Sequence, residues 1–361
     1  MNRLHQLKST LLKNISDNED YEELEFILLD YNSNDEMCQW VKDTLGVYIK
    51  SNRIIYFKTF EPDIFSHSHS KNVAFKLASG DIICNINADH YTGFSFANYV
   101  NSRFVEHGNI VLTPIDYHNT KLRDQPPKDI FGKGCVKKKD FDFVRGFDEG
   151  MNGYGFEDWD FINRLELSGV KRMLIEDMSF LQYVNHDDAE RYSLNFDTIF
   201  KICVRHISPS KSELLILYCD GKFEWGRVID NSSVNSEDYY YSFTARDYRF
   251  EYSLDEFGWK LGRWTESTNG NLILSELHGK IDYPLKKAGD KNYESFNGDP
   301  EHKRFIVISD YKTKQGLVKF KYLYYNRSIM EENLRNKRIV VNESFGKATV
   351  FRNFKNEPLS I

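Results

Sequence analysis

The stretch SKNVAFKLASGDIICNINADH, residues 70–90, decides the fold class. Its first half repeats apolar residues at helical spacing and ends at Gly80, a residue type that commonly terminates helices. Its second half is a short apolar run, Ile82 to Ile86, that gives way to polar side chains, as in a buried strand opening into a loop. A helix followed by such a strand is the building unit of a mainly parallel sheet covered by helices.

The sequence on either side continues this alternation. It predicts helices over 3–15 and about 35–46, and strands over 24–29, 53–58 and 109–117. In an open α/β sheet, ligands bind beyond the carboxyl ends of the strands. The polar residues that follow Leu29 and Ile86 are therefore predicted to share one cleft.

The pattern changes after residue 207. Short alternating segments, separated by Gly, Asn and Asp turns, predict an all-β sandwich or small barrel. These segments are 212–229, 271–281, 303–311, 317–326 and 346–354. A helix over 189–207 is predicted to link the two parts. We therefore expect an α/β domain at 1–207 and a β-rich domain at 208–361.

Composition argues against several classes of protein. The formal net charge of −6 gives no general attraction to nucleic acid phosphate. No stretch reaches the roughly 18 apolar residues of a membrane span, and the first residues lack the apolar core of a secretory signal, so we expect a soluble, cytoplasmic protein. Five cysteines without paired spacing suggest neither a disulfide framework nor a zinc site.

The segment GYGFEDWDFINRL, residues 153–165, crowds Glu157, Asp158 and Asp160 into four positions. One interpretation is a solvated helix start, because acidic side chains favour the positive end of a helix and Asp160 can pair with Arg164 one turn later. The other is that the carboxylates perform chemistry. The segment alone does not decide between them.

Asn87 and Asp89 lie two residues apart at the end of the strand in residues 70–90. Mg²⁺ and Mn²⁺ accept carboxylate, amide and phosphate oxygens together. The two side chains are therefore candidates to hold a divalent cation against a diphosphate, although an isolated Asn-x-Asp is common.

Three motifs in order resemble the GT-A glycosyltransferases. They are NRLHQL at 2–7, FSHSHSKNVAFKLASGDIICNINAD at 65–89 and GFDEGMNGYGFEDWDFINRL at 146–165. The similarity is closest to the β-1,4-galactosyltransferase type and its bacterial relatives, including chondroitin-polymerase-like enzymes, and it spans about residues 2–190. It implies a Rossmann-like GT-A domain followed by the smaller all-β domain.

The resemblance also implies a site for a UDP-sugar. Arg3 is similar to the arginine that contacts the diphosphate, and Asp30, with Asn32 beside it, to the residue that reads uracil or ribose. Asn72, in the helix before the Asp-x-Asp-like motif, and Asn87, in the motif itself, complete the implied nucleotide-sugar-binding set.

The same resemblance assigns the metal and the catalytic groups. Asp89 and His186 resemble the ligands of a Mn²⁺ or Mg²⁺ ion, and Asn87 stands where the family has its first aspartate. Asp158 matches the general base that removes the acceptor hydroxyl proton, and Glu157 matches a partner that hydrogen-bonds the acceptor. A base opposite the leaving diphosphate implies inversion in a single displacement.

Tyr154, Gly155 and Trp159 are the predicted acceptor-binding residues, because glycine lets the backbone approach a sugar and aromatic rings can cover one. Core packing is the alternative for Trp159. Phe156 replaces a glycine of the family motif and is expected to reshape this pocket.

The family has a strand before its Asn-Arg motif, whereas here Asn2 and Arg3 directly follow Met1, so we expect a truncated sequence. The leading hypothesis is a metal-dependent, inverting transferase that uses a UDP-sugar of galactose, N-acetylgalactosamine or glucose type. Its acceptor would be a glycan of a bacterial surface polysaccharide, which allows peripheral association with a membrane-bound acceptor. The alternative is a degenerate GT-A protein that binds carbohydrate or assists assembly through its β domain.

Overall fold

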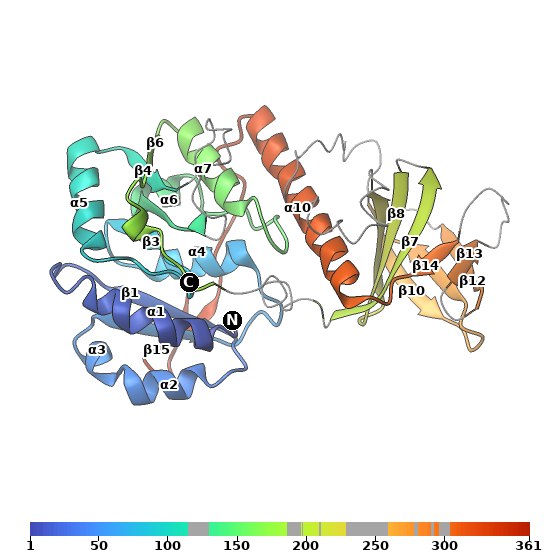
Figure 1. Cartoon of the computed structure of the whole chain (residues 1–361), viewed down its shortest axis with the longest axis horizontal. Helices are drawn as coiled ribbons and strands as arrows, with labels where there is room; N and C mark the ends of the chain where they lie inside the picture. Colours follow the sequence, from blue (N-terminus) through green and yellow to red (C-terminus); the bar gives the residue numbers. More distant parts are fainter. Residues whose placement is uncertain are drawn as a thin grey trace. The chain divides into compact units, whose positions relative to one another are not determined.

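The computed structural model describes residues 1–114, 130–185, 196, 198–208, 211–228, 259–277, 281–289, 292–295 and 304–361. The chain forms two compact units (Figure 1). The first comprises Met1–Asp187 and Ile329–Ile361, and the second comprises Asp188–Ser328. The predicted division at residue 207 differs from this in two ways: the first unit ends at Asp187, and the residues from Ile329 onward return to it.

The first unit begins with a sheet whose strand order is β1-β2-β15-β16. Its elements are α1 (Leu4–Ser16), β1 (Phe26–Tyr31), α2 (Met37–Thr44), α3 (Gly46–Lys50), β2 (Ile54–Thr59), β15 (Thr349–Arg352) and β16 (Pro358–Ser360). β1 and β2 are parallel, and β15 pairs antiparallel with β2, with Phe351 opposite Lys58. Apolar side chains of α1, α2 and α3 pack on one face of β1 and β2 and form a buried core there.

A second sheet of the first unit has the strand order β3-β5-β4-β6. Its elements are α4 (His67–Leu77), β3 (Ile82–Asn85), α5 (Phe96–His107), β4 (Ile110–Thr113), β5 (Gly134–Lys137), α6 (Lys138–Phe143), α7 (Glu157–Leu167), β6 (Lys171–Leu174) and the 3-10 turn η2 (Met178–Phe180). β4 and β6 are parallel, whereas β5 runs antiparallel to β3 and β4. The predicted alternation of helices and strands is confirmed for this part of the chain, but the predicted mainly parallel pairing is wrong here, because β5 lies between β3 and β4 and is antiparallel to both.

The described strands of the first unit form two sheets rather than one continuous sheet. Helix α1 connects them through side-chain hydrogen bonds. Thr10 Oγ1 donates to the carbonyl of Ala88 at 2.6 Å, and Asn14 Nδ2 donates to the carbonyl of His90 at 2.9 Å. The turn that follows β3 is thus held against α1.

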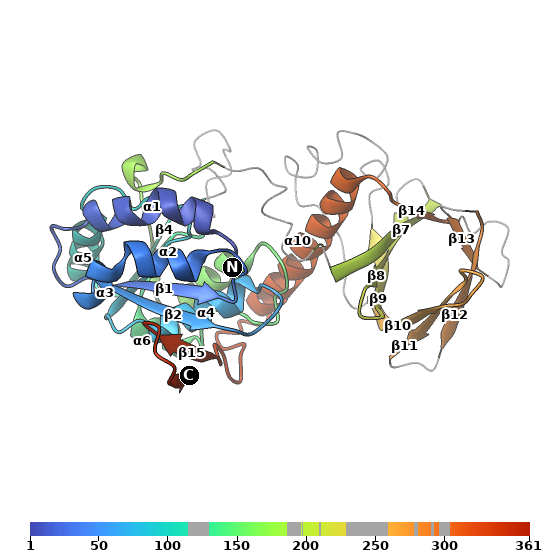
Figure 2. The ribbon, with the colours of Figure 1, turned by 90° about the horizontal axis from the view of Figure 1, so that it is seen from below.

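The second unit contains a closed eight-stranded barrel (Figure 2). Its strands are β7 (Ile199–Ser208), β8 (Lys211–Tyr218), β9 (Lys222–Val228), β10 (Lys260–Glu266), β11 (Leu272–Glu276), β12 (Asp282–Lys287), β13 (Asn292–Ser295) and β14 (Phe305–Val307). Of the two predicted alternatives, sandwich or small barrel, the structure shows the barrel. Buried aromatic and aliphatic side chains, such as Phe223, Leu274 and Phe305, fill one of its cores.

Three segments differ from the sequence prediction. Residues 317–326, predicted as a strand, belong to the helix α10 (Tyr311–Arg335), in which Leu317 and Val318 are buried against β7 and β8. The predicted helix over 189–207 falls partly outside the described residues, and its described end is strand β7. Residues 346–354 do form a strand, β15, but it completes the first unit instead of the barrel.

Candidate active site

The acidic segment lies where a loop of left-handed residues turns into helix α7. Gly153, Gly155 and Phe156 all have positive φ, at 70°, 101° and 66°. The helix then begins at Glu157, so that Glu157 and Asp158 occupy its first turn. Glu157 is only 5% exposed. This burial rules out a merely solvated helix start.

Lys71 of α4 joins the two carboxylates. Its Nζ atom donates to Asp158 Oδ1 at 2.6 Å and to Glu157 Oε1 at 3.2 Å. The side chains of Lys71 and Glu157 are 8% and 6% exposed, whereas that of Asp158 is 18% exposed. Asp158 is therefore the member of this triad that remains open to a ligand. The sequence reasoning missed Lys71, although it directly precedes Asn72 in the motif helix.

The environment of the triad separates the proton affinities of the two carboxyls. Burial raises the pKa of Asp158 to about 6, and Lys71 opposes that shift while Glu157 adds to it. Burial also acts to raise the pKa of Glu157, but the nearby cation Lys71 and the imidazole of His67 outweigh it, so the net direction is down. A general base is expected to have a pKa just below the working pH, so that it is ionised but still accepts a proton readily. The pKa of Asp158 fits this expectation at neutral pH.

His67, at the start of α4, completes the surroundings of Glu157. Its Nδ1 atom lies 3.8 Å from Glu157 Oε1, and its ring lies edge-on to Tyr154 with the centroids 5.6 Å apart. Burial lowers the pKa of His67 to about 4. The imidazole is therefore neutral near pH 7, and Lys71 is the cation of this cluster.

Asn87 borders the same space as Asp158. A Cβ atom placed on Gly132 would lie 2.8 Å from Asn87 Nδ2 and 3.4 Å from Asp158 Oδ2. Asn85 Nδ2 connects Asn87 to Gly132, because it donates to Asn87 Oδ1 at 3.0 Å and to the Gly132 carbonyl at 2.6 Å. We call the place where Asn87, Gly132 and Asp158 meet the Gly132 corner. The end of β3 and the start of α7 thus meet at Gly132.

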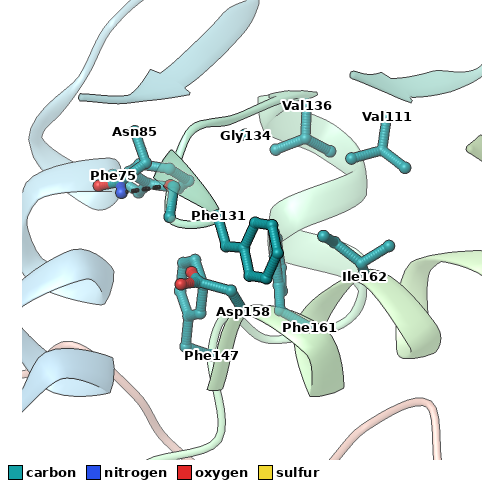
Figure 3. A pocket seen from close by; sticks show the side chains of 11 residues that line it. Phe75, Asn85, Val111, Phe131, Gly134, Val136, Phe147, Asp158, Phe161 and Ile162 are labelled. Atoms are coloured by element: carbon teal, nitrogen blue, oxygen red, sulfur yellow. Dashed lines mark hydrogen bonds between the residues drawn. The ribbon is translucent and has the colours of Figure 1, made fainter. Parts of the chain in front are cut away.

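Behind this corner lies a small apolar cavity. Figure 3 shows Asp158 and Asn85 at its polar side and the rings of Phe131 and Phe147 beside them. Its volume of about 10 Å³ is that of a single water molecule at most. A ligand as large as a sugar ring does not fit inside it.

The turn after β3 presents Asp89. The backbone N–H of Val184 donates to the Asp89 carbonyl at 2.7 Å, and Val184 stands two residues before His186 in the sequence. His186 itself lies outside the described residues. Within the described residues, no group of three or more His, Cys, Asp or Glu side chains could hold a metal ion. Asn87 and Asp89 lie two residues apart on this turn and carry an amide and a carboxylate oxygen, the kinds of ligand that Mg²⁺ and Mn²⁺ accept, although Asn87 Oδ1 also accepts a hydrogen bond from Asn85 Nδ2 at 3.0 Å.

Two predicted nucleotide-binding residues, Asn72 and Asp30, are hydrogen-bonded within the protein. Asn72 is fully buried, donating to the Phe147 carbonyl at 2.9 Å and accepting from the Phe147 N–H at 2.7 Å. Asp30 is also fully buried, and its carboxylate accepts from Ser33 N–H at 3.0 Å and from Tyr56 OH at 2.8 Å. Contact with a nucleotide would require both side chains to leave these partners.

The remaining predicted donor residues lie nearer the surface. Arg3 is half-buried and immediately precedes the first residue of α1. Asn32 follows β1 with a φ of 49° and donates to the Pro62 carbonyl at 3.2 Å. Asn32 lies at the polar strand exit that the sequence predicted. The neighbours of Arg3 contact the same loop, because the Asn2 N–H donates to Ser33 Oγ at 3.0 Å and the Leu4 N–H donates to Asp35 Oδ2 at 3.0 Å.

The predicted acceptor residues lie around the start of α7. Tyr154 stands next to His67, and Gly155 adopts a φ of 101°. Trp159 meets Phe131 edge-on, with the ring centroids 6.0 Å apart, and packs at the border of a buried core. Its partly buried position agrees with core packing, the alternative role for Trp159.

A comparison with known protein families gives a match that includes the segment around α7. Residues 121–194 match the family model described as the N-terminal domain of galactosyltransferase. This segment of the chain is therefore similar to galactosyltransferases. The match contains helix α7 with Glu157 and Asp158, and it does not reach Arg3 or Asn87. No curated protein matches the chain significantly.

The match supports a glycosyltransferase that acts on a sugar donor and an acceptor. None of the described helices is both long and apolar enough to cross a bilayer.

Proposed function

We propose that the protein is an inverting, metal-dependent glycosyltransferase that moves a galactose-, N-acetylgalactosamine- or glucose-type sugar from UDP to a glycan hydroxyl. One observation carries this proposal. The Asp158 carboxylate, poised with a pKa of about 6, shares the space above Gly132 with Asn87 of the Asp-x-Asp-like turn. A bacterial surface polysaccharide is the proposed product.

The chemistry follows from a single displacement. Asp158 accepts the proton of the acceptor hydroxyl while its oxygen forms a bond to the anomeric carbon of the donor sugar. The bond between that carbon and the diphosphate oxygen breaks with its electron pair on the oxygen, so the configuration inverts. Lys71 holds Asp158 in place, and Glu157 in turn accepts a hydrogen bond from Lys71. A divalent cation, bound by Asn87, Asp89 and, as the resemblance implies, His186, would neutralise charge on the departing diphosphate.

The proposal is tested by incubating the protein with a panel of nucleotide sugars and measuring release of UDP with and without Mn²⁺. We expect Mn²⁺-dependent release from one UDP-hexose, faster in the presence of a glycan acceptor. A protein that binds glycans but releases no UDP from any donor would instead be the carbohydrate-binding or assembly module.

The pH dependence of transfer should report on Asp158. Its pKa is raised to about 6, so the base is ionised above that pH and protonated below it. We expect kcat/KM to be level above about pH 7 and to fall nearly tenfold per pH unit below about pH 5. Initial rates measured between pH 4.5 and 8 give the apparent value, which belongs to the coupled carboxylates. A profile that is flat from pH 5 to 7 would contradict the assignment.

Gly132→Ala tests the corner between Asn87 and Asp158. The new Cβ atom would stand 2.8 Å from Asn87 Nδ2, so the Asn87 amide must move. We expect the KM for the donor to rise about three- to tenfold, the equivalent of one hydrogen bond. Gly134→Ala is the matched control, because its Cβ meets nothing closer than the Leu112 carbonyl at 3.9 Å. Equal donor KM values for the two variants would mean that Asn87 does not contribute to donor binding.

A further inference from the structure

A second cavity of the first unit lies apart from Asp158. It has a volume of about 250 Å³ and is formed by α2, β2 and the chain around β15. The residues that line it are Cys38, Lys42, Tyr56, Lys58, Phe60, Phe351, Phe354, Lys355 and Asn356. None of them has a part in the transfer chemistry proposed above. The volume is that of a ligand smaller than a drug-sized molecule, such as one sugar ring with a substituent.

The charged side chains that line this cavity are all positive. Three lysines line it, and no lining residue is acidic. Lys58 lies 3.3 Å from the buried carboxylate of Asp30. Among the residues that the structure describes, Lys42 and Lys355 have no carboxylate within ion-pair distance. Two ammonium groups at the cavity are thus not neutralised by the protein, which favours an anionic ligand.

Aromatic rings hold these cations next to apolar surface. Lys42 Nζ lies 5.2 Å from the ring centroid of Phe354, and Phe354 stacks on Tyr56 with the centroids 4.8 Å apart. Lys58 Nζ lies 5.2 Å from the ring centroid of Phe60, which is 58% exposed. Cation–π contacts of this kind fix an ammonium group beside a ring face. The cavity therefore presents positive charge and flat apolar surface together.

We propose that this cavity binds a monosaccharide-sized anion, in which a phosphate or carboxylate group is attached to a ring. The anionic group pairs with Lys42 and Lys355. Lysine suits this role because its ammonium group binds phosphate as a point charge. The ring of the ligand covers the exposed faces of Phe60 and Phe351. Either a free sugar phosphate or an acidic residue of a glycan has this chemistry. The proposal does not depend on the transferase activity.

The test is calorimetric titration of the whole protein with glucose 1-phosphate, glucuronate, inorganic phosphate and glucose. We expect saturable binding of glucose 1-phosphate or glucuronate, whichever anion fits, at least tenfold tighter than that of inorganic phosphate. Glucose should not bind measurably. Equal affinity for inorganic phosphate would overturn the role of the ring, and the absence of saturation by both anionic sugars would overturn the site.

Variants locate the binding. Lys42→Gln combined with Lys355→Gln should weaken binding of the preferred anion at least tenfold without altering the fold, because neither side chain is buried. Lys8→Gln combined with Lys50→Gln removes the same charge from exposed positions of α1 and α3 and should leave the affinity within twofold. If both double variants bind equally well, the anion binds elsewhere and the proposal fails.

Discussion

Asp158→Asn should lower kcat/KM for sugar transfer by about 10²- to 10⁴-fold, the range that general-base catalysis contributes. The amide keeps the shape of the side chain but cannot accept the hydroxyl proton at neutral pH. Lys71 keeps Glu157 as its partner at 3.2 Å, so the cluster still contains an ion pair. The measurement is the initial rate of UDP release in the presence of acceptor, with donor and acceptor varied separately.

The stability of this variant separates catalysis from folding. In the folded protein the pKa of Asp158 is about 6, above its usual value of 3.8, so the folded state binds this proton more tightly than the unfolded state. The resulting contribution to stability is present below pH 3.8 and is lost as the pH rises through 6. Asparagine does not ionise, so the variant avoids the cost of ionising residue 158 in the folded state. We therefore expect an unchanged or raised melting temperature at pH 7. Asp142→Asn, at an exposed position of α6, is the control and should keep full activity.

Arg164→Met should destabilise the first unit by about 3–5 kcal/mol, the cost of leaving a buried carboxylate without its partner. Arg164 is 1% exposed, and its Nε atom donates to Asp160 Oδ2 at 2.6 Å. Its other nitrogens donate to the carbonyls of Val144, Gly146 and Ile339 at 3.0, 2.7 and 3.3 Å. Methionine fills much of the volume but satisfies none of these acceptors.

Urea unfolding monitored by tryptophan fluorescence and far-ultraviolet circular dichroism checks this prediction. Each transition is to be analysed separately, because two units need not unfold together. Arg338→Met is the matched control. Arg338 pairs with Glu332 at 2.8 Å, but both side chains are about half exposed, so its loss should cost less than about 1 kcal/mol. Equal effects of the two substitutions would mean that the buried ion pair does not hold α7 in place.

The sequence predicted those parts of the site that local patterns specify. The helix start at Glu157 and the pairing of Asp160 with Arg164 depend on residues at most one turn apart, and both are confirmed. The prediction that Asn87 and Asp89 lie directly after a strand is also confirmed. Each of these features is decided by the spacing of neighbouring side chains.

Contacts between distant residues could not be predicted in this way. Lys71 stands 86 residues before Glu157, and no local pattern indicates that they pair. The same holds for β15: the sequence predicts a strand there, but only its pairing with β2 decides that it belongs to the first unit. Helix α10 was mistaken for a strand since residues 317–326 combine alternation with many aromatic side chains, which are typical of strands.

The return of residues Ile329–Ile361 to the first unit has a consequence for biosynthesis. A growing polypeptide emerges from the ribosome at about 5–20 residues per second, so the intervening barrel delays completion of the first sheet by on the order of ten seconds. During that interval the edge of β2 that will receive β15 is unpaired, and such an edge invites association with other nascent chains. Efficient production of this protein should therefore respond to chaperones that shield strand edges until translation ends.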